Sequence, residues 1–170
     1  MPEPPTVVRE IERTAAISRC RAYRYSLMRR WSDAPLLPFV MLNPSTADAV
    51  EDDPTIRRCI GLARREGAGG ILVANLYALR SPSPQALWAV RDPIGPKNWR
   101  TLVGLAAQAI EQSAPIICAW GAQARQDQTD RALRMFQSSG ARLACLGRTK
   151  EGAPRHPLYV RASQPLERFP

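Results

Sequence analysis

The sequence predicts an α/β protein: a three-layer α/β/α sandwich around a mainly parallel, four-stranded central sheet. Two observations lead to this prediction. Short, continuously apolar segments recur along the chain, which is typical of strands buried on both faces. Longer segments with apolar residues at helical spacing lie between them. This alternation indicates parallel strands joined by helical crossovers.

The four strands predicted for the central sheet are residues 38–42, 71–76, 115–120 and 141–146. The first helix is predicted to begin at Asp53-Pro54, because Asp is a favourable cap and Pro fits the first helical position. Gly67 is expected to end this helix. The other predicted helices are residues 83–90, 97–113 and 123–138.

The region before the first central strand is predicted to form a β-hairpin. Residues 22–31 and 36–42 are apolar or aromatic, and the segment between them, Ser32-Asp33-Ala34-Pro35, has turn-forming residues. The Pro-rich residues 1–15 are predicted to be a flexible N-terminal segment. Residues 16–170 are then expected to form a single α/β domain, a size that can enclose a full core.

Two features predict a cytoplasmic protein that does not enter a membrane. No apolar stretch approaches the roughly 18 residues that a membrane-spanning helix requires. The N-terminal sequence carries acidic residues and prolines and lacks the apolar centre of a signal peptide.

The charge of the chain points to a polyanionic partner. Lys and Arg number 24 against 15 Asp and Glu, a net charge of +9. All but Lys97 and Lys150 of these cations are Arg, which suits bidentate contacts to phosphate. We therefore expect nucleic acid, DNA before RNA, or a nucleotide as partner. The alternative is a basic surface that only contacts water.

Polar residues follow several of the predicted strands, where ligands bind in parallel sheets. Asn43 follows the first strand, Asn75 ends the second, and His156, the only histidine, follows the fourth. Each has a structural alternative. Asn43-Pro44 could be a turn, Asn75 a buried amide held by hydrogen bonds, and His156 a surface or packing residue.

These residue types suggest recognition of a nucleobase. An amide can pair with a base edge through one donor and one acceptor. A neutral His can donate a hydrogen bond to an oxygen that gains negative charge. Asn43 could hold a water molecule through its carbonyl, but an amide is no strong base near neutral pH. The sequence has no glycine-rich phosphate loop after a strand.

Five motifs resemble a bacterial and phage family of domains of unknown function. The resemblance covers about residues 20–160. The motifs are Leu42-Asn43-Pro44-Ser45-Thr46-Ala47-Asp48, Asp52-Asp53-Pro54-Thr55-Ile56-Arg57-Arg58-Cys59, Asn75-Leu76, Ala119-Trp120-Gly121 and Arg155-His156-Pro157-Leu158-Tyr159.

That family in turn resembles the uracil-DNA glycosylase superfamily in the order of its motifs. The resemblance implies a uracil-DNA-glycosylase-like fold into which a base is flipped. It implies that Asn43 positions the attacking water, that Asn75 binds the base, and that His156 stabilises the leaving base. Pro44 and Ser45 would shape the pocket and contact a phosphate.

The sequence departs from that superfamily in several places. The strongest uracil glycosylases carry Asp where Asn43 stands, and Leu158 replaces a Ser of the late His-Pro motif. Either Leu158 or Tyr159 could wedge into a base stack. The aromatic residue that stacks on the base has no clear counterpart, and the candidates are Tyr77 and Trp120.

Other charged residues near the motifs are also candidates. Asp48 and Asp52 could supply the general base that Asn43 cannot, or bind a metal, although we expect no metal and no cofactor. Asp53 is explained as a helix cap. The candidate phosphate-binding residues are Arg57, Arg58, Arg80 and Arg155.

Three functions follow from these patterns. The first is a nucleobase-recognising N-glycosidic hydrolase acting on a base in nucleic acid or a nucleotide. The second is a non-catalytic module on the same fold that binds nucleic acid or a modified nucleotide. The third is a different small-molecule enzyme that uses Asp48, Asp52 and His156.

Overall fold

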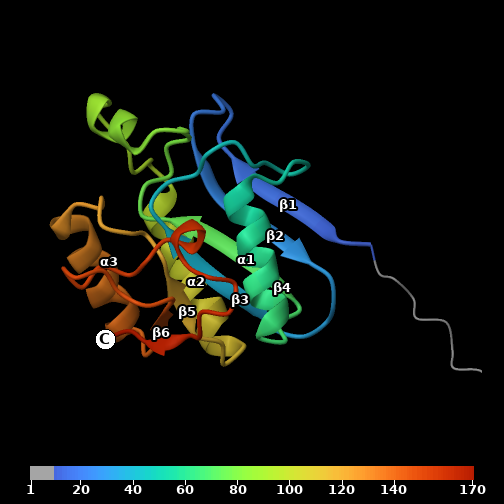
Figure 1. The fold of residues 1–170 in the computed structure, drawn as a ribbon. Coiled ribbons are helices and arrows are strands. Elements are labelled where there is room, and N and C mark those ends of the chain that lie inside the picture. Colours follow the sequence, from blue (N-terminus) through green and yellow to red (C-terminus); the bar gives the residue numbers. More distant parts are fainter. Residues whose placement is uncertain (1–9) are drawn as a thin grey trace, which may run out of the picture.

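The computed structural model describes residues 10–170, which form one seven-stranded mixed sheet with helices on both faces (Figure 1). The strand order is β1-β2-β4-β3-β5-β6-β7. The strands are β1 (Glu12–Ile17), β2 (Arg24–Arg30), β3 (Leu36–Met41), β4 (Gly70–Asn75), β5 (Ile116–Cys118), β6 (Leu143–Cys145) and β7 (Glu167–Arg168). The helices are α1 (Pro54–Arg65), α2 (Asn98–Glu111) and α3 (Gln126–Ser138), with short 3-10 helices η1 (Pro84–Ala89) and η2 (Pro157–Tyr159).

The prediction of a mainly parallel, four-stranded sheet is wrong in strand number and direction. Three strand pairings are parallel, β3 with β4, β3 with β5 and β5 with β6. Three are antiparallel, β1 with β2, β2 with β4 and β6 with β7. The four predicted strands do form and are mutually parallel. The flanking strands were missed because β1 is mostly exposed and β7 is very short, so neither has the apolar run that marks a buried strand.

The predicted hairpin between residues 22–31 and 36–42 is also wrong. β4 lies between β2 and β3, and β2 forms its hairpin with β1 instead. Glycines at the start of β4 make the insertion possible. A Cβ on Gly69 would collide with the Ala34 backbone, and one on Gly70 with the Arg29 carbonyl oxygen. Only glycine lets β4 enter between the two strands this closely.

The three helices cover opposite faces of the sheet, as the three-layer prediction requires. Helix α1 packs on one face through Ile56, Cys59, Leu62 and Ala63. Helices α2 and α3 pack on the other face together with η1. Their buried apolar residues are Leu87, Leu102, Leu105, Ala106, Ala109, Ala132 and Phe136. The predicted cap is confirmed, since the Asp53 side chain accepts a hydrogen bond from the backbone N–H of Ile56.

The N-terminal prediction covers residues that the structure describes only in part. Residues 1–9 lie outside the described residues. Residues 12–15, which were assigned to a flexible segment, form most of β1 and pair with β2 in register. Within residues 10–170, no helix is long and apolar enough to cross a membrane.

Candidate functional site

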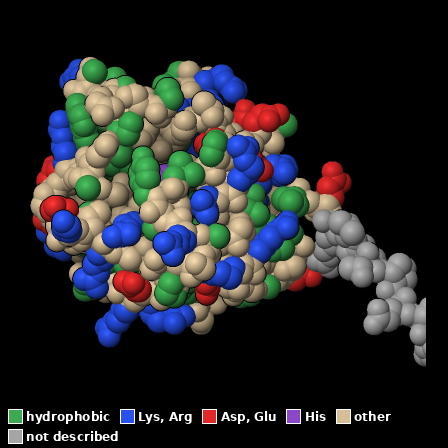
Figure 2. Space-filling model, viewed as in Figure 1, with side chains coloured by type: hydrophobic (Ala, Val, Ile, Leu, Met, Phe, Trp, Pro, Cys, Tyr) green, Lys and Arg blue, Asp and Glu red, His purple; other side chains and the backbone are tan. Residues whose placement is uncertain are grey.

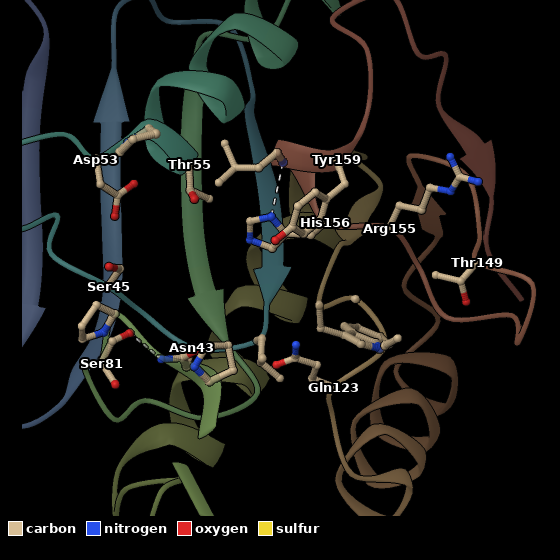
Figure 3. Close-up of a pocket in the computed structure, with 18 of the residues that line it drawn as sticks. Asn43, Ser45, Asp53, Thr55, Ser81, Gln123, Thr149, Arg155, His156 and Tyr159 are labelled. Carbon is tan, nitrogen blue, oxygen red and sulfur yellow. Dashed lines mark hydrogen bonds between the residues drawn. The ribbon is translucent and has the colours of Figure 1, made fainter. Parts of the chain in front are cut away.

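A cleft of about 990 Å³ opens where the four parallel strands end at their carboxyl termini. Its walls come from the segment after each strand: residues 42–46 after β3, 81–84 after β4, 120–123 after β5 and 149–159 after β6. The beginning of α1, residues 53–55, completes it. Figure 3 shows Asn43, Ser45 and Ser81 on one side of this cleft and Thr149 and Arg155 on the other, with His156 and Tyr159 between them. Ligand binding at the carboxyl ends of parallel strands is the general behaviour of such sheets.

His156 lines the cleft as a neutral hydrogen-bond donor. Its Nδ1 accepts the backbone N–H of Leu158 at 3.3 Å (Figure 3), which caps η2. Burial lowers the pKa of the imidazole below its ordinary value of 6.5, although the nearby Asp53 charge acts in the opposite direction. Because Nδ1 is an acceptor, the proton of the neutral ring lies on Nε2.

Asn43 also lines the cleft, and its amide group is oriented by the chain. The Nδ2 group donates to the carbonyl oxygens of Pro44, Leu79 and Ser81 at 3.2, 3.4 and 3.0 Å. These bonds join the segments that follow β3 and β4. The Asn43 Oδ1 accepts no hydrogen bond from residues 10–170, which leaves it as an acceptor for a ligand or a water.

Of the residues predicted to contact a base, two line the cleft and three do not. Trp120 and Ser45 line it, and the Trp120 ring packs edge-on against Phe169 at 5.9 Å. Pro44 is buried outside the lining. Tyr77 is also outside the lining: its ring packs within the core, and its hydroxyl accepts the backbone N–H of Arg125.

The third residue outside the cleft is Asn75, which is 1% exposed. Neither its Oδ1 nor its Nδ2 has a hydrogen-bond partner within the described chain. Its backbone oxygen accepts a hydrogen bond from Asn98 Nδ2 at 2.8 Å. Asn75 is therefore not among the residues that line the cleft of Asn43 and His156, and its buried amide is left unpaired within residues 10–170.

The aspartates near the motifs serve the local structure. Asp48 Oδ1 accepts the backbone N–H groups of Val50 and Glu51 at 2.8 Å, and these bonds lower the pKa of the carboxyl. Asp52 forms ion pairs with Arg29 and Arg13, both at 2.9 Å. Neither aspartate lines the cleft with His156, so the geometry does not support a catalytic group made of these three residues.

Asp53 lines the cleft, and each of its carboxylate oxygens accepts a backbone hydrogen bond. Its Oδ1 accepts the Ile56 N–H at 2.9 Å and its Oδ2 accepts the Ala47 N–H at 3.3 Å. We expect Asp53→Ala to lower the free energy of unfolding by about 1–2 kcal/mol, the usual cost of a lost helix cap. Urea denaturation measures this, and an unchanged midpoint would contradict the assignment. Glu111→Ala, at an exposed position at the end of α2, provides a carboxylate-removal control outside this cap.

The predicted phosphate-binding arginines lie in different places. Arg155 lines the cleft, and its Nε donates to the Arg148 carbonyl oxygen at 3.0 Å. Arg80 lies outside the lining. Arg57 and Arg58 line an adjacent groove along α1. In Figure 2 the only histidine is visible within a hollow of the surface, between hydrophobic side chains.

Several lining residues were not singled out from the sequence. They are Thr46, Thr55, Ser81, Gln123, Thr149, Lys150 and Glu151. Most of them follow a central strand, so a search extended by a few residues beyond each strand end would have found them. Within the described residues, no three His, Cys, Asp or Glu side chains form a group that could hold a metal ion.

Comparison with known proteins identifies the family of the chain. No curated protein and no solved structure matches it. The sequence model of a family described as "Protein of unknown function (DUF1643)" matches residues 24–158, which include all five motifs except the final Tyr159. Since this match covers most of the 170 residues, the chain belongs to the DUF1643 family.

Proposed function

We propose that the cleft recognises a nucleobase and hydrolyses its N-glycosidic bond, in a nucleic acid or a nucleotide. The observation that carries this proposal is the meeting of Asn43 and His156 in one cleft. Asn43 belongs to the first motif and His156 to the last, and each presents a different hydrogen-bonding group to the cleft. Asn43 presents an acceptor that could orient water, and His156 presents an N–H donor.

The size and lining of the cleft suit a nucleotide. A volume of about 990 Å³ is at the upper end of small-molecule pockets. Trp120 supplies an apolar wall, while Ser45 and Gln123 supply hydrogen-bonding groups for a base edge. Lys150 and Arg155 supply positive charge for a phosphate. The cleft therefore offers groups for the base and for the phosphate of a nucleotide.

The proposed reaction consumes one water molecule. The water oxygen bonds to the sugar C1′ while the bond from C1′ to the base nitrogen breaks, and its electron pair leaves with the base. Asn43 Oδ1 orients the water by accepting a hydrogen bond. His156 Nε2–H donates to the base oxygen on which negative charge develops. The water proton ends on the released base, so the products are a free base and a sugar hydroxyl.

The resemblance to uracil-DNA glycosylases supports the same assignment for Asn43 and His156. It does not extend to Asn75, which lies outside the cleft. We therefore assign base recognition to the groups that line the cleft, with Trp120, Ser45 and Gln123 as the residues most suited to it.

The proposal is tested by incubating the purified protein with uracil-containing, deaminated, alkylated and mismatched DNA and measuring base release. We expect release from at least one substrate, and a loss of about 100-fold in Asn43→Ala, because the water is no longer oriented. Gln137→Ala, an exposed change on α3, is the matched control and should match the wild type. No release from any substrate would overturn the hydrolase proposal.

A second function, binding without hydrolysis, is favoured by the state of the carboxylates. Asp53 is held by two backbone N–H groups, and Glu151 is the other acidic residue in the lining. The Asp53 oxygens already accept hydrogen bonds that cap α1 and hold Ala47, so this carboxylate has a structural role that explains it without catalysis. Binding of thymidine monophosphate, measured by calorimetry, without base release in the panel above would support this second function.

A further inference from the structure

A second groove of about 660 Å³ runs along the outer side of α1. Its lining consists of Pro54, Arg57, Arg58, Gly61, Leu62, Arg65, Leu158 and Ala162. Pro54 and Leu158 also line the cleft. The groove and the cleft are therefore adjacent and share a border, so one extended ligand can occupy both.

The groove carries positive charge and no acidic lining residue among those described. Arg58 forms no ion pair or hydrogen bond within residues 10–170. Arg57 donates one hydrogen bond to the Asp52 carbonyl oxygen at 2.6 Å, and its other side-chain N–H groups have no partner within residues 10–170. Arg65 pairs with Glu66 at 2.6 Å. Arg57 and Arg58 are therefore the arginines of the groove that have free donors. Both lie near the N-terminal end of α1, where the helix dipole also favours anions.

The floor of the groove is open because of Gly61. A Cβ added there would meet nothing within 4 Å, so packing within the described chain does not require a glycine. Glycine in a helix interior costs stability relative to alanine. Its effect here is to let a ligand approach the helix backbone between the arginine side chains.

Exposed apolar side chains stand at the border between groove and cleft. Tyr159 is 81% exposed and Leu158 is 41% exposed. The Tyr159 ring centre lies 5.8 Å from that of His156. An exposed aromatic ring beside a basic groove is the combination that single-stranded nucleic acid binds, the ring stacking on a base and the groove following the phosphates.

We infer that the protein binds single-stranded nucleic acid, with one nucleotide in the cleft, the next base on Tyr159 and the following phosphates on Arg57 and Arg58. This inference rests on the proposed function, because it requires the cleft to hold a nucleotide. A duplex fits these features less well, since its bases are stacked inside and must be unpaired before they can lie on Tyr159.

The test measures binding of a fluorescent single strand of about twelve thymidines, a length within the range that single-strand-binding folds cover. We expect Arg57→Gln with Arg58→Gln to weaken binding at least tenfold. The slope of log affinity against log salt should fall by about 1.4, since each phosphate contact on a single strand contributes about 0.7.

Two matched controls isolate the groove. Arg100→Gln with Arg134→Gln removes the same charge from exposed positions of α2 and α3, on the opposite face of the sheet, and should change affinity less than twofold. Gly61→Ala should raise the thermal unfolding midpoint yet lower the affinity for the single-stranded oligonucleotide several-fold. Gly104→Ala, also at an open helical position, should raise the midpoint without affecting binding.

Tyr159 is tested by comparing Tyr159→Ala with Tyr159→Phe. The alanine variant should bind the oligonucleotide about tenfold more weakly than the wild type. The phenylalanine variant should keep most of the wild-type affinity, because stacking needs the ring and not the hydroxyl.

The outcomes separate this inference from the proposed function. If thymidine monophosphate binds but the strand binds no tighter, or the arginine double variant binds like the wild type, the inference is wrong and the cleft keeps its assignment. Tighter binding of the matching duplex would also overturn it. If neither monophosphate nor strand binds at low salt, both the inference and the proposed function fail.

Discussion

Asp52→Ala should lower the free energy of unfolding by about 3 kcal/mol, the largest stability effect that we expect from a single change near the motifs. Arg29 is a fully buried cation, and Asp52 is its carboxylate partner at 2.9 Å. Removing one member of a buried ion pair leaves the other charge uncompensated, which costs about 3–5 kcal/mol. The low end applies because Asp52 is partly exposed and four backbone carbonyl oxygens also hold Arg29.

Urea denaturation of the wild type, Asp52→Ala and Glu51→Ala measures this effect. The Glu51 side chain is exposed, so its removal should leave the midpoint almost unchanged. Adding Arg29→Met to Asp52→Ala should recover part of the loss, because the unpaired buried charge is then gone. A wild-type midpoint for Asp52→Ala would show that the ion pair contributes little, and would reopen a functional role for this aspartate.

His156→Ala should reduce base release by about 100-fold or more, the usual effect of removing one donor to a developing oxyanion. The variant loses the Nε2–H donor of a residue that lines the cleft and also the Nδ1 acceptor that caps η2, so folding is checked separately. His156→Gln keeps a side-chain N–H donor and should retain more activity than His156→Ala. Equal activity of wild type and His156→Ala, with both folded by circular dichroism, would contradict the assigned role.

The pH dependence follows from the same imidazole. Burial lowers the pKa of His156 below 6.5, so the imidazole is a neutral donor above pH 6.5. The rate of base release should therefore not depend on this group above pH 6.5. As the pH falls through the lowered pKa, the ring becomes charged and base release should change. In the unfolded chain the ring binds a proton more readily, so the free energy of unfolding should also fall below pH 6.5. In His156→Ala this contribution to the stability profile should disappear.

The features that the sequence alone determined are local. Residues 71–76 form β4 with small differences at the ends, because a short apolar run bounded by turn residues favours a buried strand. Asp53-Pro54 begins α1 because the cap and the fixed proline geometry act within one helical turn. Asn43 and His156 were found by the same reasoning, since residues that follow parallel strands meet at one edge of the sheet.

The tertiary structure decided what depends on contacts between distant segments. Gly69 and Gly70 allow β4 to enter between β2 and β3, so the expected hairpin does not form. Asp52 is an ion-pair partner only because β2 brings Arg29 beside it. Asn75 ends a strand as predicted, yet its side chain is buried and is not among those that line the cleft. Backbone preferences act over a few residues, whereas strand order and side-chain burial are set by packing across the whole chain, and that packing buries the Asn75 side chain.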